Sequence, residues 1–126
     1  MNQVTGIPAL AGAIGMALRR HRSLLMQELC IHDAIEGALL DVGIECVREY
    51  VIAPGSRLDF WLPATRTAVE VKKRRAGLGD LQQVARYLDL PVVDSGVLIA
   101  MRIAEDVPTV LRGKPLGRVE FWKYLL

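Results

Sequence analysis

Charged side chains interrupt two otherwise apolar segments near the middle of the chain. Asp59 lies in the segment 57–62 (RLDFWL), and Glu70 and Lys72 lie in the segment 67–73 (TAVEVKK). Burying a charge away from water is unfavourable unless the charge is paired. Charged groups in such positions are typical of catalytic and ligand-binding sites. We therefore take these three residues as the centre of a candidate site.

The expected strand geometry brings the three side chains together. Residues two apart on a strand point to the same face, so Glu70 and Lys72 share a face. The short turn between the two segments places Asp59 beside the Glu70 strand. Two carboxylates on neighbouring strands suit a hard divalent cation such as Mg²⁺, and a lysine beside them suits a phosphate or a metal-polarised water. A simpler interpretation also fits, in which Glu70 pairs with Lys72 and Asp59 with Arg57 on the surface of a hairpin.

A helix is predicted over residues 24–42, because apolar residues recur there at helical spacing and Gly43 follows as a C-cap. At about 100° per residue, Glu28 lies in the middle of the apolar stripe. We expect Glu28 to be the acid that this helix contributes to the site, with Glu36, at the edge of the stripe, as the alternative. His32 flanks Glu28 and is expected in a supporting position. A partly buried Glu28 paired with an arginine, and a His32 with a structural hydrogen bond, remain the simpler interpretations.

A second helix is predicted over residues 81–88, with Asp80 as its N-cap and Pro91 excluding its continuation. Gln83 and Tyr87 are one turn apart, so they share a face of this helix. We expect them to contact a phosphate or a metal-bound water, since this helix directly follows the strand that carries Glu70. Exposed polar residues on an amphipathic helix are the simpler explanation.

The remaining segments complete a mixed pattern of helices and strands. Apolar runs bounded by turn residues predict four strands, at residues 44–52, 57–62, 67–73 and 96–101. The predicted order is therefore helix, three strands, helix, strand. The chain up to Leu18 is expected to form a helix that packs outside the core. Residues 111–117 are expected to form a loop, and residues 118–125 an edge strand or a short helix.

Length and composition indicate one domain, residues 1–126, with no membrane span. The chain has 126 residues, of which 52% are hydrophobic, and no apolar run approaches the roughly 18 to 20 residues that cross a bilayer. Glycines and a proline interrupt the apolar segment 4–18, so we do not expect a secretory signal. Cys30 and Cys46 have no metal-ligand spacing and form no disulfide framework. These features favour a cytoplasmic protein.

Positive charge is clustered although the net charge is only +2. One run covers residues 19–22, and another covers residues 72–75, starting at the lysine of the candidate site. Clusters of this kind are typical of nucleic-acid contacts, and they also occur on ordinary solvated faces.

The order of elements and the motifs together resemble the PD-(D/E)xK nuclease superfamily, which includes Holliday junction resolvases and RecB-like nucleases. The resemblance covers residues 24–101. It implies an α/β fold of the restriction-endonuclease type, with an αβββαβ core, a mixed central sheet flanked by helices, an extra N-terminal helix and a C-terminal strand. One departure is visible, because Leu58 precedes Asp59 where the motif has proline.

The resemblance implies a nuclease that hydrolyses DNA phosphodiester bonds with a preference for structure rather than sequence. Asp59, Glu70 and the Val71 backbone carbonyl would hold Mg²⁺ or Mn²⁺, and Glu28 would complete a second metal site or hold a ligating water. Lys72 would orient or deprotonate the attacking water, or pair with the developing charge. Gln83 and Tyr87 would position the phosphate.

Basic residues are expected to bind the nucleic-acid backbone, largely independently of sequence. They are Lys73, Arg74, Arg75 and Arg86. The expected partner is DNA, with RNA left open. A domain of this size would need a homodimer or a larger assembly to cut two strands, and the N-terminal segment and the tail 121–126 are candidate interfaces or core.

Two other classes of function compete with the nuclease. The first is a nuclease-like module that binds nucleic acid or a partner protein without significant catalysis. The second is a structural domain whose hairpin charges are surface ion pairs. Convergence of Glu28, Asp59, Glu70 and Lys72 in one cleft would favour the nuclease.

Overall fold

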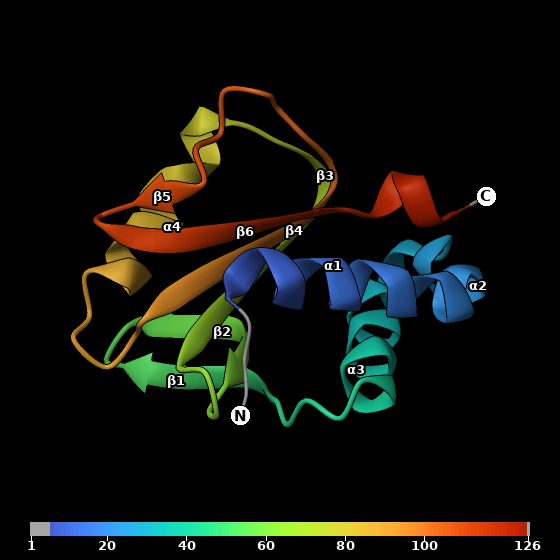
Figure 1. The fold of residues 1–126 in the computed structure, drawn as a ribbon, viewed down its shortest axis with the longest axis horizontal. Coiled ribbons are helices and arrows are strands. Elements are labelled where there is room, and N and C mark those ends of the chain that lie inside the picture. Colours follow the sequence, from blue (N-terminus) through green and yellow to red (C-terminus); the bar gives the residue numbers. More distant parts are fainter. Residues whose placement is uncertain (1–5, 126) are drawn as a thin grey trace.

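The computed structural model describes residues 6–125 and shows a six-stranded mixed sheet with helices on both faces (Figure 1). The strands follow the order β1-β2-β3-β4-β6-β5 across the sheet. The strands β1 to β3 form an antiparallel meander, β4 and β6 run parallel to β3, and β5 closes the edge antiparallel to β6. Their bounds are β1 Val47–Ala53, β2 Ser56–Leu62, β3 Thr67–Ala76, β4 Ser95–Ile103, β5 Val110–Leu111 and β6 Lys114–Glu120.

Helices cover the two faces of the sheet separately. One face packs against α1 and α3, and the other packs against α4, so each face has its own hydrophobic cluster. The α-helices are α1 Ile7–Leu18, α2 Arg22–Leu25, α3 Ile31–Asp41 and α4 Leu81–Leu88, and 3₁₀ turns cover Arg19–His21, Glu28–Cys30, Leu78–Asp80 and Phe121–Tyr124. The order α3-β1-β2-β3-α4-β4 confirms the predicted order of helix, three strands, helix, strand. No helix among the described residues is long and apolar enough to cross a membrane.

The first helix belongs to the core, so the prediction that it packs outside the core was wrong. Ile14 and Leu18 are fully buried, and burial of such a side chain contributes about 1.5–3 kcal/mol. Close approach to β6 depends on Gly117, because a Cβ atom there would lie 2.7 Å from Ile7. The part of the predicted N-terminal helix at residues 1–5 lies outside the described residues.

The predicted continuous helix over residues 24–42 is broken in the structure. The chain is extended at Gln27, and Glu28 opens a 3₁₀ turn before α3 begins at Ile31. Continuing the helix through Glu28 would place its carboxylate in the buried stripe, and desolvating an unpaired carboxylate is unfavourable. The break leaves Glu28 exposed. The predicted C-terminus is close to the observed one, with Gly43 in the left-handed region at φ 73°.

The C-terminal part of the chain is more regular than expected. Residues 111–117 were predicted as a loop, yet they contain the end of β5, a two-residue turn and the start of β6. β6 is not an edge strand, because it lies between β4 and β5. Of the tail considered as an interface, Phe121 is fully buried and belongs to the core, while Leu126 lies outside the described residues.

Candidate active site

The candidate site lies where β2 and β3 separate. The two strands pair only from Phe60 with Val69 to Leu62 with Thr67. Beyond that point β2 continues beside β1, and β3 continues beside β4. Asp59 and Glu70 are the first residues past the last pair, so both carboxylates lie at the point of separation. Unpaired backbone groups at such a point need other partners.

The Asp59 carboxylate is the hydrogen-bond partner of one of those backbone groups. Its Oδ2 accepts a hydrogen bond of 2.7 Å from the Val71 backbone N–H. This contact ties the β2 side chain to the peptide between Glu70 and Val71. The predicted approach of Asp59 to the Glu70 strand is therefore present in the structure.

Glu70 is a buried acid, with 6% of its surface exposed. Its Oε2 lies 3.2 Å from the Lys72 ammonium, so the two residues do share a face as predicted. Burial, and after it the charge of Asp59, raise the pKa of Glu70 to about 7, although Lys72 acts to lower it. A single lysine therefore does not compensate the two carboxylates, and a cation placed between them would be stabilised.

A chain of hydrogen bonds holds Lys72 from the side of α4. Lys72 Nζ donates to Gln83 Oε1 at 3.4 Å, and Gln83 Nε2 donates to the Tyr87 hydroxyl at 2.7 Å. The Tyr87 hydroxyl donates in turn to the Arg57 carbonyl at 2.8 Å. Burial raises the pKa of Tyr87, which keeps its hydroxyl protonated and able to donate. The two α4 residues therefore contact the site as a connected unit.

The α3 side of the site is formed by His32 rather than by the acids of that helix. His32 Nε2 lies 3.9 Å from Asp59 Oδ1, and its ring packs edge-on against Phe60 at 5.7 Å between ring centroids. Glu36 turns away and pairs with Arg48 at 3.1 Å, so the alternative acid does not join the site. Glu28 is exposed and lies on the wall of the same hollow as His32 and Asp59.

Two adjoining hollows reach Asp59 and Lys72, whereas the buried Glu70 is not among the residues that line them. The first, the carboxylate hollow, has a volume of about 440 Å³ and is lined by Glu28, His32, Asp59, Val71, Lys72, Lys73, Arg74, Arg75 and Asp80. The second, the α4 groove, is lined by Lys72, Gly79, Asp80, Gln82, Gln83, Arg86 and Arg112. Lys72 and Asp80 line both, so the two hollows adjoin at these residues. The predicted basic residues Lys73, Arg74, Arg75 and Arg86 all line one or the other.

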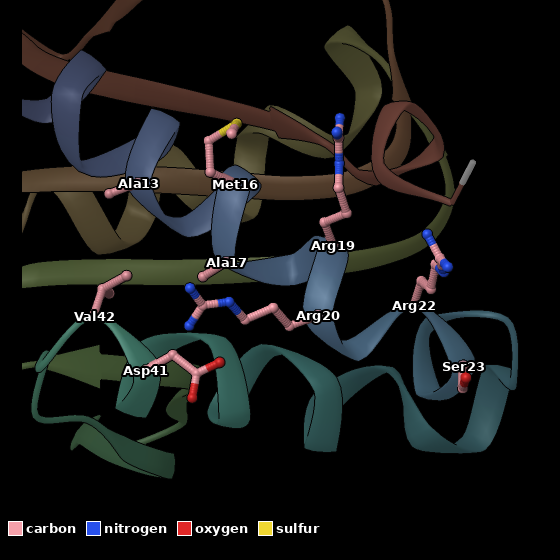
Figure 2. A pocket seen from close by; sticks show the side chains of 9 residues that line it. All are labelled: Ala13, Met16, Ala17, Arg19, Arg20, Arg22, Ser23, Asp41 and Val42. Atoms are coloured by element: carbon pink, nitrogen blue, oxygen red, sulfur yellow. The ribbon is translucent and has the colours of Figure 1, made fainter.

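A third hollow contains arginines of the other basic run (Figure 2). This arginine hollow lies between α1, α2 and α3, has a volume of about 770 Å³, and is lined by Ala13, Met16, Ala17, Arg19, Arg20, Arg22, Ser23, Asp41 and Val42. Its acid, Asp41, already pairs with His21 at 2.8 Å. Size and positive charge are therefore not what distinguishes the candidate site.

The donor set for a metal consists of two carboxylates. Among residues 6–125 no group of three or more His, Cys, Asp and Glu side chains is arranged to hold a metal ion. Asp59 and Glu70 match the one or two carboxylates that Mg²⁺ takes when water and substrate oxygens complete its shell. Cys30 and Cys46 are both free thiols and take no part.

Sequence reasoning missed two residues that line the hollows. Asp80 was assigned to a helix cap, and its carboxylate accepts a 2.8 Å hydrogen bond from the Gly77 N–H while it also faces both hollows. Arg112 belongs to the segment read as a loop, and no local signal in the sequence connects it to α4. Only the parallel placement of β6 beside β4 brings it there.

Comparison with known proteins gives no match. No protein-family model matches the chain, and neither a curated protein nor a solved structure is similar to it. The functional interpretation therefore depends on the geometry of the site itself.

Proposed function

We propose that this protein is a metal-dependent nuclease of the PD-(D/E)xK type, with a restriction-endonuclease-like core, that hydrolyses DNA phosphodiester bonds. The observation that carries the proposal is the meeting of Asp59, Glu70 and Lys72 where β2 and β3 separate. The pKa of the buried Glu70 is raised to about 7, because ionising this carboxyl beside Asp59 is unfavourable. A cation bound between the two carboxylates would stabilise their charged forms. The lysines and arginines that line the neighbouring hollows outnumber the acids there.

Mg²⁺ or Mn²⁺ is the proposed cofactor, and the donor chemistry fits it. Asp59 and Glu70 would hold the ion together with the carbonyl of Val71, the residue whose N–H already donates to Asp59. Bound there, the ion would supply charge stabilisation at the scissile phosphate and a more acidic attacking water.

The protein's own residues would position the reacting groups. Lys72 lies 3.2 Å from Glu70 and is restrained by Gln83, so its ammonium can orient the attacking water or the scissile phosphate. Tyr87 fixes the Gln83 amide and thereby the direction in which Lys72 points. His32, 3.9 Å from Asp59, is placed to restrain that carboxylate or to contact the phosphate.

A cleavage assay tests the proposal directly. With Mg²⁺ or Mn²⁺, the purified protein is expected to cut DNA, and a panel of linear, nicked, flapped and four-way substrates will define the preferred structure. Asp59→Asn is expected to abolish cleavage. Asp41→Asn, which removes a carboxylate from the arginine hollow, is the matched control and is expected to leave cleavage unchanged. Undiminished cleavage by Asp59→Asn would refute the proposal.

A binding module without significant catalysis is the second candidate, and one observation favours it. No third metal-binding side chain joins Asp59 and Glu70 among the described residues. Calorimetric titration separates the two candidates, because a nuclease should take up Mg²⁺ and lose that uptake on Asp59→Asn. A protein that binds DNA but takes up no Mg²⁺ would be a binding module.

A further inference from the structure

We propose that Arg112 and Arg86 form a phosphate-binding subsite in the α4 groove, which holds the nucleic-acid strand to one side of the carboxylate pair. The inference rests on the proposed function, since it assigns part of the substrate path of the same site. It adds a second contact region, contributed by the β5–β6 hairpin, to the basic residues of β3.

The α4 groove leads directly from the candidate site to Arg112. It begins at Lys72, which contacts Glu70, and it continues past Gln83 and Arg86. Asp89, at the end of α4, pairs with Arg112. The helical rise from Gln83 to Asp89 is about 9 Å along the α4 axis. That length corresponds to two to three nucleotides along one strand of B-DNA. A phosphate near Arg112 would therefore belong to the strand that passes the carboxylate pair.

The charge of the groove suits a polyanion. Its lining contains three cations, Lys72, Arg86 and Arg112, and one acid, Asp80. The Asp80 carboxylate accepts a hydrogen bond from the Gly77 N–H, which stabilises its charge locally. Arg86 and Arg112 are both exposed, so a phosphate can reach them without rearrangement of the fold.

The backbone at Arg112 gives an independent reason to assign it a function. Arg112 and Gly113 form the two-residue turn of the β5–β6 hairpin, and both have positive φ, 55° and 73°. Asparagine and glycine are favoured at such positions, whereas arginine is unfavourable there. Within the described part of the chain its partner is the exposed Asp89 carboxylate, and this ion pair is weak, since Arg112 Nε lies 3.6 Å from Asp89 Oδ1. The local structure therefore does not explain the choice of arginine.

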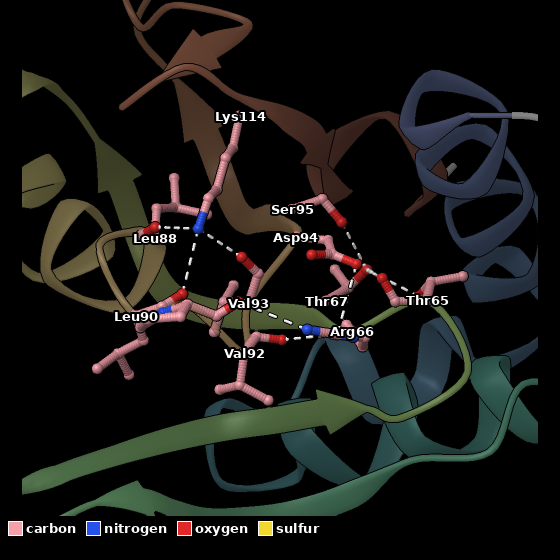
Figure 3. A network of polar contacts seen from close by, with 11 residues as sticks. Thr65, Arg66, Thr67, Leu88, Leu90, Val92, Val93, Asp94, Ser95 and Lys114 are labelled. Atoms are coloured by element: carbon pink, nitrogen blue, oxygen red, sulfur yellow. Dashed lines mark hydrogen bonds and ion pairs between the residues drawn. The ribbon is translucent and has the colours of Figure 1, made fainter.

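Arg66 is the informative contrast, because it has a similar backbone and a structural explanation. Its φ is 52°, and it also pairs with an exposed aspartate, Asp94, at 3.4 Å. Arg66 in addition donates a 3.0 Å hydrogen bond to the Val92 carbonyl, which ties the β2–β3 turn to the segment before β4 (Figure 3). It lines neither the carboxylate hollow nor the α4 groove.

The test compares Arg112→Asn with Arg66→Asn. Asparagine tolerates positive φ, so both turns should be retained. Binding of a fluorescein-labelled single-stranded DNA 12-mer is followed by anisotropy in EDTA, which prevents metal-dependent cleavage, over a range of salt concentrations. Arg112→Asn is expected to weaken Kd roughly three- to tenfold near 0.1 M salt and to reduce the salt slope by about 0.7. Arg66→Asn is expected to change neither.

The outcomes separate this inference from the proposed function. An equal loss in both variants, no loss in Arg112→Asn, or no binding of DNA by the wild type would each overturn the subsite. Normal cleavage by wild type with normal binding by Arg112→Asn would overturn the subsite alone. Salt-dependent binding that requires Arg112, in a protein that does not cut with Mg²⁺ or Mn²⁺, would support the subsite and refute the nuclease.

Discussion

The carboxylate hollow and the arginine hollow show that clustered positive charge does not by itself identify a site. Each contains a basic run, residues 72–75 in the first and residues 19–22 in the second. The first lies beside the buried Glu70 and the partly exposed Asp59, whose combined charge a single lysine leaves uncompensated. The second contains one acid, which His21 already pairs.

The strand separation explains why the two regions differ. At the carboxylate hollow, β2 and β3 diverge and leave backbone and side-chain groups that face one another across the gap. At the arginine hollow, the 3₁₀ turn Arg19–His21 packs closely on α3, and a Cβ atom on Gly37 would lie 2.5 Å from the His21 ring. The first region therefore has polar groups that can contact a ligand, whereas in the second the His21–Asp41 pair joins the 3₁₀ turn to α3.

The largest difference between the hollows should be seen in catalysis. Lys72→Met removes the ammonium beside Glu70 and is expected to lower the DNA cleavage rate by at least about 100-fold. Arg20→Met makes the corresponding change in the arginine hollow and is expected to alter the rate by less than about twofold. Single-turnover cleavage with Mg²⁺ measures both variants, and thermal unfolding checks that both are folded. Comparable losses of cleavage rate in the two variants would show that the two hollows do not differ in catalysis.

The buried acid should also make the stability of the metal-free protein depend on pH. Because the pKa of Glu70 is raised from 4.5 to about 7 in the folded state, the folded protein binds more protons than the unfolded chain between these values. The free energy of unfolding should therefore fall by about 3 kcal/mol as pH rises from 4.5 to 7. Urea denaturation in EDTA measures this fall.

The Glu70→Gln variant is the control for that pH dependence. It cannot ionise at this position, so the fall between pH 4.5 and 7 should largely disappear. Mg²⁺ at pH 7.5 should stabilise the wild type and should not stabilise Glu70→Gln. A wild type and a variant with the same pH profile would show that Glu70 does not carry the effect.

A smaller effect is expected for the hydrogen-bond chain of α4. Tyr87→Phe removes a hydroxyl that accepts from Gln83 and donates to the Arg57 carbonyl. The loss should cost about 1–2 kcal/mol of stability and lower cleavage severalfold, since Lys72 loses its indirect support. Tyr124→Phe is the matched change beside the arginine hollow, where the ring lies under Arg19. It should affect neither stability nor cleavage measurably.

The sequence predicted the carboxylate pair well because strand alternation is a local property. Spacing alone places Glu70 and Lys72 on one face, and a short turn brings Asp59 to the neighbouring strand. The helix 81–88 was confirmed for the same reason, because its apolar stripe lies within the segment, although Asp80 makes no side-chain capping hydrogen bond to it. Both features could therefore be predicted from neighbouring residues alone, without information on tertiary contacts.

The α3 side was harder to predict because a helical wheel assumes an unbroken helix. The wheel put Glu28 at the centre of a buried stripe, yet the chain breaks at Gln27 and exposes Glu28. His32 lies in the intact part of the helix and reaches Asp59. Arg112 could not be found at all, because its position follows from the tertiary placement of β6.

The smallest expected effect would decide which helix acid belongs to the site. Glu28 lies on the wall of the carboxylate hollow, whereas Glu36 pairs with Arg48 away from it. Glu28→Gln should therefore lower cleavage a few fold without changing stability. Glu36→Gln should cost at most about 1 kcal/mol, the usual range for a solvent-accessible ion pair, and leave cleavage unchanged. The reverse result would return Glu36 to the site and would require α3 to rotate when substrate binds.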